Sequence, residues 1–267
     1  MVEEAAALGY KEIALTDLNS FAGIVRAHAA AKKAGIRLIV GCRLKLLDGI
    51  GLLAYPGNRQ AYAQLCNLLT LGNRRTEKGK CHLYKADVYK YAEGIKFIVL
   101  PPAELNELYD FDLSFSVALT EYKNAFGNNI YLAASRRYLG DDSKYFYRLA
   151  ALSAQLKIPL VATNNVYYHQ PGRRQLQDIV TCIREKCTIH NAGYRLHPNA
   201  ERYLKPNDEM LRLFRQYPEA ILHTQEIVHA CPFSLDELKY EYPEEITTDG
   251  RTQIGRASCR ERVCAIV

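Results

Sequence analysis

Short apolar runs alternate with helical patterns along most of this chain, and this alternation constrains the fold more than any other feature. Six runs have the length of buried strands, and they cover residues 12–16, 37–41, 50–55, 96–100, 129–133 and 158–164. Between most of these runs apolar residues recur at helical spacing, which predicts helices over residues 2–8, 21–34, 60–71 and 144–156. Repeated strand-then-helix units are typical of a parallel sheet or barrel. The sequence therefore predicts an α/β fold whose strands run in one direction.

The pattern changes after residue 168. Helices are expected over residues 173–185, 207–217 and 218–230, the last with Pro218 in its first turn. The only later stretch with strand character is 238–242. We therefore expect a β/α body over residues 1–190 and a mainly helical connector over residues 191–248.

The composition is that of an ordinary globular protein. Of 267 residues, 48% are hydrophobic and 24% are charged, and the net charge is a mild +6. Arginines occur in pairs at 74–75, 136–137 and 173–174. We interpret these pairs as part of a solvated surface rather than as a nucleic-acid contact. No apolar run approaches the roughly 20 residues that span a bilayer, and the acidic start of the chain lacks a signal core. We expect a cytoplasmic protein with no membrane partner and with reduced, unlinked cysteines.

The last residues differ in character from the rest. Residues 253–267 show neither a helical period nor a capping residue, and the string IGRASCRERV within them resembles the translation of a sequencing adapter. We interpret residues 253–267 as an artefact and leave them out of the fold prediction. The alternative is a short basic tail.

Carboxyl ends of parallel strands share one edge of a sheet, where chemistry is usually done. The residues expected there are Thr16-Asp17-Leu18-Asn19, Gly41-Cys42-Arg43, Ala54-Tyr55, Ala133-Ala134-Ser135 and Asn164-Asn165. A divalent-metal hydrolase needs several His, Asp or Glu ligands, but Asp17 is the one carboxylate of this set and Arg43 adds a cation. Asp17 has a second open role, as a cap for the following helix. Near this edge, His169 is more typical of an exposed loop residue than of a ligand, and no nucleophile or phosphate-loop motif occurs.

Several strings of the chain, taken together, resemble a known family. They are Leu15-Thr16-Asp17, Leu38-Ile39-Val40-Gly41-Cys42, Tyr62-Ala63-Gln64-Leu65-Cys66, Ala162-Thr163-Asn164-Asn165-Val166 and Gln177-Asp178-Ile179-Val180-Thr181-Cys182. This set resembles the N-terminal PHP (polymerase and histidinol phosphatase) domain of bacterial C-family DNA polymerase III alpha subunits. Three further strings point to the error-prone, damage-tolerant branch, namely Lys80-Cys81-His82-Leu83, Ala133-Ala134-Ser135-Arg136 and Phe233-Ser234-Leu235-Asp236-Glu237-Leu238-Lys239-Tyr240-Glu241-Tyr242-Pro243. The resemblance covers residues 1–248.

The resemblance implies a distorted (β/α)7 barrel. Six strands are visible, so we expect the family's first strand, with its His-x-His motif, to precede Met1. On this interpretation the chain is truncated at its C-terminus, and it is either truncated at its N-terminus too or starts at an internal Met. The barrel then has an open edge between its first and last strands.

The resemblance also implies where a metal site would lie. The vestigial metal-site positions are Asp17, Leu18, Arg43, Ala133, Asn165 and Tyr167. In members that bind metal these positions hold acidic residues or histidines, and here only Asp17 does. A fixed positive charge at Arg43 opposes a metal ion. We therefore expect no bound metal and no catalytic residue in this fragment, and we hypothesise a buried Asp17–Arg43 ion pair in the space of the metal.

The leading functional prediction is an N-terminal fragment of an error-prone DNA polymerase III alpha subunit, with a degenerate PHP barrel as scaffold. The parent protein would carry out DNA-templated synthesis past damage with Mg²⁺, using primer-template DNA and deoxynucleotides bound by a palm domain that follows. A sliding clamp and other damage-response proteins are further expected partners. The alternatives are a metal-dependent PHP phosphoesterase and a free-standing interaction module.

Overall fold

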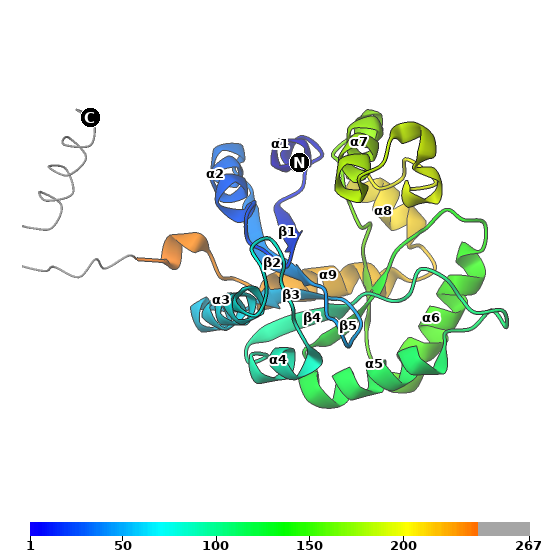
Figure 1. Ribbon diagram of the computed structural model, residues 1–267, viewed down its shortest axis with the longest axis horizontal. Helices are drawn as coiled ribbons and strands as arrows, with labels where there is room; N and C mark the ends of the chain where they lie inside the picture. The colour runs from blue at the N-terminus through cyan, green and yellow to red at the C-terminus, as the bar shows by residue number, and fades with distance from the viewer. Residues whose placement is uncertain (240–267) are drawn as a thin grey trace, which may run out of the picture. The chain divides into compact units, whose positions relative to one another are not determined.

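The computed structural model describes residues 1–239, and residues 1–235 belong to one compact unit. Its centre is a curled sheet of six strands in the order β1-β2-β3-β4-β5-β6 (Figure 1). The strands are β1 (Glu12–Leu18), β2 (Arg37–Leu44), β3 (Leu52–Pro56), β4 (Ile95–Val99), β5 (Ile130–Ala134) and β6 (Leu160–Ala162). The predicted α/β class and the six predicted strands are confirmed.

The strand directions correct one prediction. β1 pairs with β2 in parallel, and β4, β5 and β6 are mutually parallel, but β3 is antiparallel to both of its neighbours. The physical reason is the connection between β2 and β3, residues 45–51. It is too short for the crossover of about ten or more residues that a parallel pair needs. The expected strand end Ala54-Tyr55 therefore does not lie at the edge shared by the other carboxyl ends.

Helices connect most of the strands. They are α1 (Val2–Ala7), α2 (Ile24–Ala34), α3 (Arg59–Arg74), α4 (Lys85–Lys90), α5 (Leu113–Phe126), α6 (Asp142–Leu156), α7 (Arg174–Glu185), α8 (Asn207–Leu213) and α9 (Pro218–Ala230). The sequence did not predict α4 and α5. The helix predicted over residues 60–71 ends too early, because α3 continues through Gly72 to Arg74. A Cβ at Gly72 would lie 2.6 Å from the sulfur of Cys81, so this glycine permits close packing.

One face of the sheet, here called the outer face, is covered by helices. Cys42, Phe97 and Leu132 of this face pack in one core with residues from α3, α5 and α6. Leu65 of α3 and Leu119 of α5 are both 0% exposed in that core. Because a fully buried leucine contributes about 1.5–3 kcal/mol, this core is a main source of stability.

The other face, here called the inner face, packs against α9. Tyr55, Tyr131 and Val161 form a core there with Ile227 of α9. The Tyr131 hydroxyl donates to a carboxylate oxygen of Glu226 at 2.6 Å. Part of the predicted connector thus packs on the sheet (Figure 1). The boundary at residues 190 and 191 stays a prediction.

Two further sequence interpretations fall partly or wholly outside the described residues. The run 238–242 is described only to residue 239, and the suspected artefact at 253–267 lies wholly beyond that point. Across residues 1–239, none of the helices is both long and apolar enough to cross a membrane.

Candidate functional site

The carboxyl ends of β1, β2, β4, β5 and β6 share one edge of the sheet, here called the strand-end edge. At this edge Asp17 pairs in register with Cys42, and Leu18 pairs with Arg43. Register partners of parallel strands point to the same face, whereas successive residues of one strand point to opposite faces. The side chains of Asp17 and Arg43 therefore point to opposite faces of the sheet. The strand register excludes the hypothesised Asp17–Arg43 ion pair, so that hypothesis is wrong.

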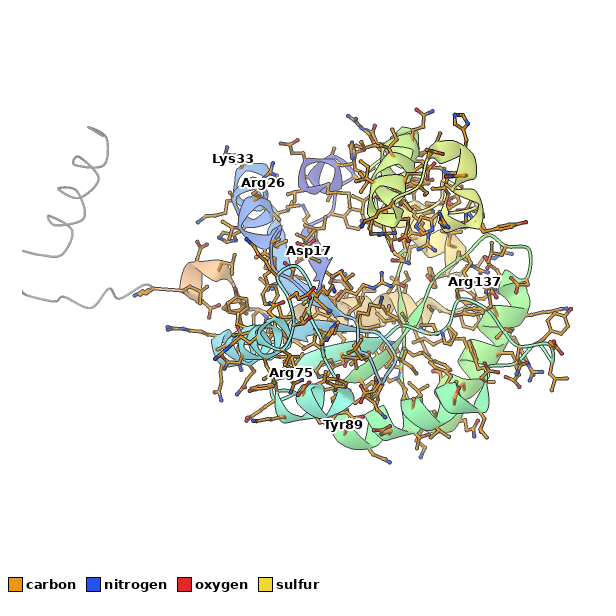
Figure 2. The ribbon with its side chains drawn as sticks, in the orientation of Figure 1. Asp17, Arg26, Lys33, Arg75, Tyr89 and Arg137 are labelled. Atoms are coloured by element: carbon orange, nitrogen blue, oxygen red, sulfur yellow. The ribbon has the colours of Figure 1, made fainter. Side chains whose placement is uncertain are left out.

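Asp17 instead holds the start of α2. Its Oδ2 accepts a hydrogen bond from the backbone N–H of Gly23 at 2.6 Å, and the helix begins at the next residue. Figure 2 places Asp17 on the side of β1 and α2, far from Arg137. A Cβ at Gly23 would lie 2.7 Å from Asp17 Oδ2, so a glycine is needed for this close approach. Of the two roles that the sequence left open, capping is the one that the geometry favours.

The other vestigial positions carry no group that binds a cation well. Leu18 is 56% exposed, and Ala133 is 3% exposed within the inner core. Asn165 is exposed and has a left-handed backbone with φ 44°. Arg43 Nη1 donates to the hydroxyl of Tyr167 at 3.4 Å.

This set of side chains does not fit a divalent metal. Such ions are bound by several carboxylate, imidazole or carbonyl groups together. Here the one carboxylate accepts a hydrogen bond at α2, and a guanidinium stands among the remaining groups. Within residues 1–239, no three His, Cys, Asp or Glu side chains gather as a metal site. The absence of bound metal stays a prediction.

The strand-end edge does bring together a group of basic and aromatic side chains that sequence reasoning missed. The guanidinium carbon of Arg202 lies 5.5 Å from the ring centre of Tyr167, and His197 packs on the same ring at 5.0 Å. Backbone bonds hold this segment in place, since Tyr167 N donates to Arg202 O at 2.9 Å. Residue 202 belongs to no strand, so the strand-end rule could not find it. A single bridge between Tyr168 and Tyr203 positions it.

Burial, and secondarily the positive charge of neighbouring groups, lowers the pKa values of Arg202 and His197 at this edge. Burial lowers the pKa of the Arg202 guanidinium, and the nearby charge of Arg43 lowers it further, against opposing contributions from Tyr167 and Tyr168. Burial also lowers the pKa of His197, and the charge of Arg202 adds to this effect. The imidazole of His197 is therefore mainly neutral at pH 7.

A cavity of about 20 Å³ lies beside this group, with room for about one water molecule. It is lined by Ser135, Arg136, Arg137, Asn164, Asn165, Asn199, Glu201 and Arg202. Residues that follow β5 and β6 therefore lie together in the wall of this cavity, as expected for carboxyl ends of parallel strands. The carboxylate of Glu201 lies 3.0 Å from the ammonium of Lys205, and the guanidinium of Arg137 pairs with Asp141 and Asp142. Arg136, which also lines the cavity, donates to the backbone carbonyl of Leu213 at 2.9 Å.

Comparison with known proteins identifies the family. Residues 1–137, just over half of the chain, match the family model described as PHP domain, and the chain therefore belongs to the PHP domain family. The predicted resemblance is confirmed by relatives named for the error-prone branch. The chain is 44% identical over 251 residues to "Error-prone DNA polymerase 2" of Agrobacterium fabrum, covering 94% of this chain and 22% of the relative. It is 45% identical over 258 residues to "Error-prone DNA polymerase" of Brucella abortus, covering 94% and 23%. The chain thus spans less than a quarter of the length of these relatives.

The solved structures that match this chain are more distant. An amidohydrolase from Chromobacterium violaceum superposes with a TM-score of 0.45 at 15% identity, covering 61% of this chain and 80% of the other. A metal-dependent phosphoesterase from Bifidobacterium adolescentis gives 0.43 at 14% identity, covering 61% and 79%. At this level of similarity, neither bears on the function of this chain.

Proposed function

We propose that this chain is the N-terminal PHP domain of an error-prone DNA polymerase, and that it serves as a scaffold without metal chemistry. The observation that carries the proposal is the guanidinium of Arg43 against the hydroxyl of Tyr167, at the edge where a metal site would be built. The commitment of Asp17 to the start of α2 supports it. Relatives named error-prone DNA polymerase, 43–45% identical over nearly the whole chain, support the polymerase context.

The packing of the sheet suits a scaffold. Tyr55 and Tyr131 of its inner face pack with Ile227 of α9 in a buried core, as side chains do inside a structural barrel. Lesion-tolerant DNA synthesis, with primer-template DNA, deoxynucleotides and Mg²⁺, is proposed for the parts of the protein beyond this chain. Two-metal nucleotidyl transfer needs clustered carboxylates, and residues 1–239 bring no such cluster together. A sliding clamp and other damage-response proteins are proposed partners of the longer protein.

A primer-extension assay tests the polymerase part of the proposal. This chain and the full-length protein are compared on undamaged and lesion-containing templates with Mg²⁺. We expect extension, including extension past the lesion, only with the full-length protein. Extension by this chain alone, or no extension by the full-length protein on any template, would contradict the proposal.

A hydrolysis assay decides between the scaffold and the phosphoesterase alternative. The chain is incubated with a phosphomonoester in the presence of Mn²⁺ or Zn²⁺, beside an Asp17→Asn variant purified in the same way. We expect no turnover above background in either sample. Turnover that is lost in Asp17→Asn but kept in an Arg59→Gln control would establish the phosphoesterase and refute the scaffold.

A further inference from the structure

Two arginines at the strand-end edge, Arg43 and Arg202, have no acidic partner among residues 1–239. The side chain of Arg43 contacts the hydroxyl of Tyr167, and that of Arg202 stacks on the ring of the same tyrosine. Among residues 1–239, no carboxylate forms an ion pair with either guanidinium. A half-buried cation without an opposite charge costs free energy, because burial removes part of its hydration.

Three nearby arginines do have acidic partners. Arg137 pairs with two aspartates, Arg174 lies 3.5 Å from the carboxylate of Asp178, and Arg184 lies 3.1 Å from that of Glu185. Arg136 has no carboxylate partner among residues 1–239 either, but its guanidinium donates to the backbone carbonyl of Leu213 at 2.9 Å and lies 4.4 Å from the ring centre of Phe146. Arg43 and Arg202 instead both contact one exposed tyrosine, Tyr167. These charges also act on each other, since the charge of Arg43 helps to lower the pKa of Arg202. An anion between them would remove this repulsion.

We propose that Arg43 and Arg202 bind a phosphate group at the strand-end edge without a metal ion. Guanidinium groups match phosphate oxygens with paired hydrogen bonds, and two of them neutralise a phosphate dianion. The neighbouring cavity holds only about one water, so the phosphate lies outside it, next to Tyr167, which both arginines contact. Tyr167 is 37% exposed and packs with His197, so an aromatic surface for a nucleotide base lies beside the two cations.

Such a phosphate has two sources, a free phosphate or phosphomonoester and the phosphodiester backbone of single-stranded DNA. The proposal does not depend on the polymerase context, because it follows from the charges at this edge alone. Every measurement is made with EDTA present, so that binding through a metal cannot mimic binding by the arginines.

The test uses three probes on the chain as it exists. Inorganic phosphate is titrated by calorimetry. Single-stranded oligodeoxynucleotides with and without a 5′-phosphate are titrated by fluorescence anisotropy. Competition by inorganic phosphate shows whether the probes share a site. Tighter binding of the 5′-phosphorylated strand alone identifies a phosphomonoester, and equal binding of both strands identifies the phosphodiester backbone.

Three charge-removing variants make the test specific. Arg43→Gln and Arg202→Gln each remove one proposed ligand, and neither side chain supports the fold through an ion pair with the described residues. Arg59→Gln is the matched control, because Arg59 is exposed and follows the antiparallel strand β3, at the opposite edge of the sheet. We expect each proposed ligand to be worth about tenfold in phosphate affinity, as is typical of hydrogen bonds between charged groups, and the control to leave affinity unchanged.

The effect of the three variants on binding distinguishes a specific site from attraction by net charge. A loss confined to Arg43→Gln and Arg202→Gln, with unchanged circular dichroism and unfolding midpoint, supports the site. An equal loss in all three variants would mean that binding reflects net charge only, and it would overturn the proposal. Absence of binding by every probe at millimolar concentration would overturn it as well. Failure here leaves the scaffold role intact, since that role is tested by hydrolysis and primer extension.

Discussion

Replacement of Asp17 by alanine separates the role of this residue in the fold from a role in metal chemistry. Its carboxylate accepts the Gly23 N–H at 2.6 Å where α2 begins. Capping interactions contribute about 0.5–2 kcal/mol, and hydrogen bonds to charged groups about 1.5–3 kcal/mol. Because Asp17 is only partly buried, we expect Asp17→Ala to lower the free energy of unfolding by about 1–2 kcal/mol. At about 2–4 °C per kcal/mol for a chain of this size, the melting temperature should fall by about 2–8 °C.

A double-mutant cycle with Gly23 tests whether the lost stability comes from the contact between Asp17 and Gly23. Gly23→Ala places a Cβ 2.7 Å from Asp17 Oδ2 and 3.0 Å from a methyl group of Leu15, so it should destabilise the wild-type chain. Much of that cost should disappear in the Asp17→Ala background, because the oxygen that it meets is gone. Asp17→Asn, which keeps an acceptor oxygen, should cost less than Asp17→Ala. Urea unfolding followed by circular dichroism measures all four variants. An unchanged midpoint in Asp17→Ala, or strictly additive costs in the cycle, would refute the capping role.

Three further predictions concern titration and the inner face. Hydrogen bonds from Arg75 lower the pKa of Asp87 in the folded state. The stability that they provide is therefore full above about pH 4 and is lost as the pH falls through the pKa of Asp87 in the folded protein. Urea unfolding from pH 7 to 3 should show a smaller acid-dependent loss of stability in Asp87→Asn than in the wild type, and an unaltered pH profile would contradict this. Tyr131→Phe removes the hydroxyl that donates to the carboxylate of Glu226 on α9. The free energy of unfolding, measured by urea denaturation, should fall by about 1–3 kcal/mol, whereas an unchanged value would speak against that contact. Arg202→Gln should raise the pKa of His197, measured by NMR titration, and a constant pKa would mean that the two groups do not interact.

The periodicity of the sequence was sufficient to predict the sheet but not all of its helices. The spacing of Phe115, Leu119, Tyr122 and Phe126, all buried, is that of a helix face, so the pattern of α5 was present in the sequence. The direction of β3 could also be argued in advance, because residues 45–51 leave no room for a crossover. Strand number depends on local apolar runs, whereas strand direction depends on the length of the connections.

The candidate site was predictable only in part. The strand-end rule placed Arg43 and Asn165 near the edge, and the edge does carry them. The rule could not predict that Asp17 and Arg43 point to opposite faces of the sheet, because the face of each side chain depends on the register between β1 and β2. It could not find Arg202 or His197 either, since both lie in irregular backbone that a few long-range hydrogen bonds position.

The metal content of the purified chain tests the central claim most directly. The chain is purified without added metals and measured by elemental analysis, and its melting temperature is compared with and without EDTA. The account predicts far less than one metal ion per chain and a melting temperature that EDTA leaves unchanged, because the strand-end edge presents guanidinium groups where a metal would need carboxylates. One or more tightly bound Zn²⁺ or Mn²⁺ ions per chain, with a melting temperature that falls on chelation, would contradict it.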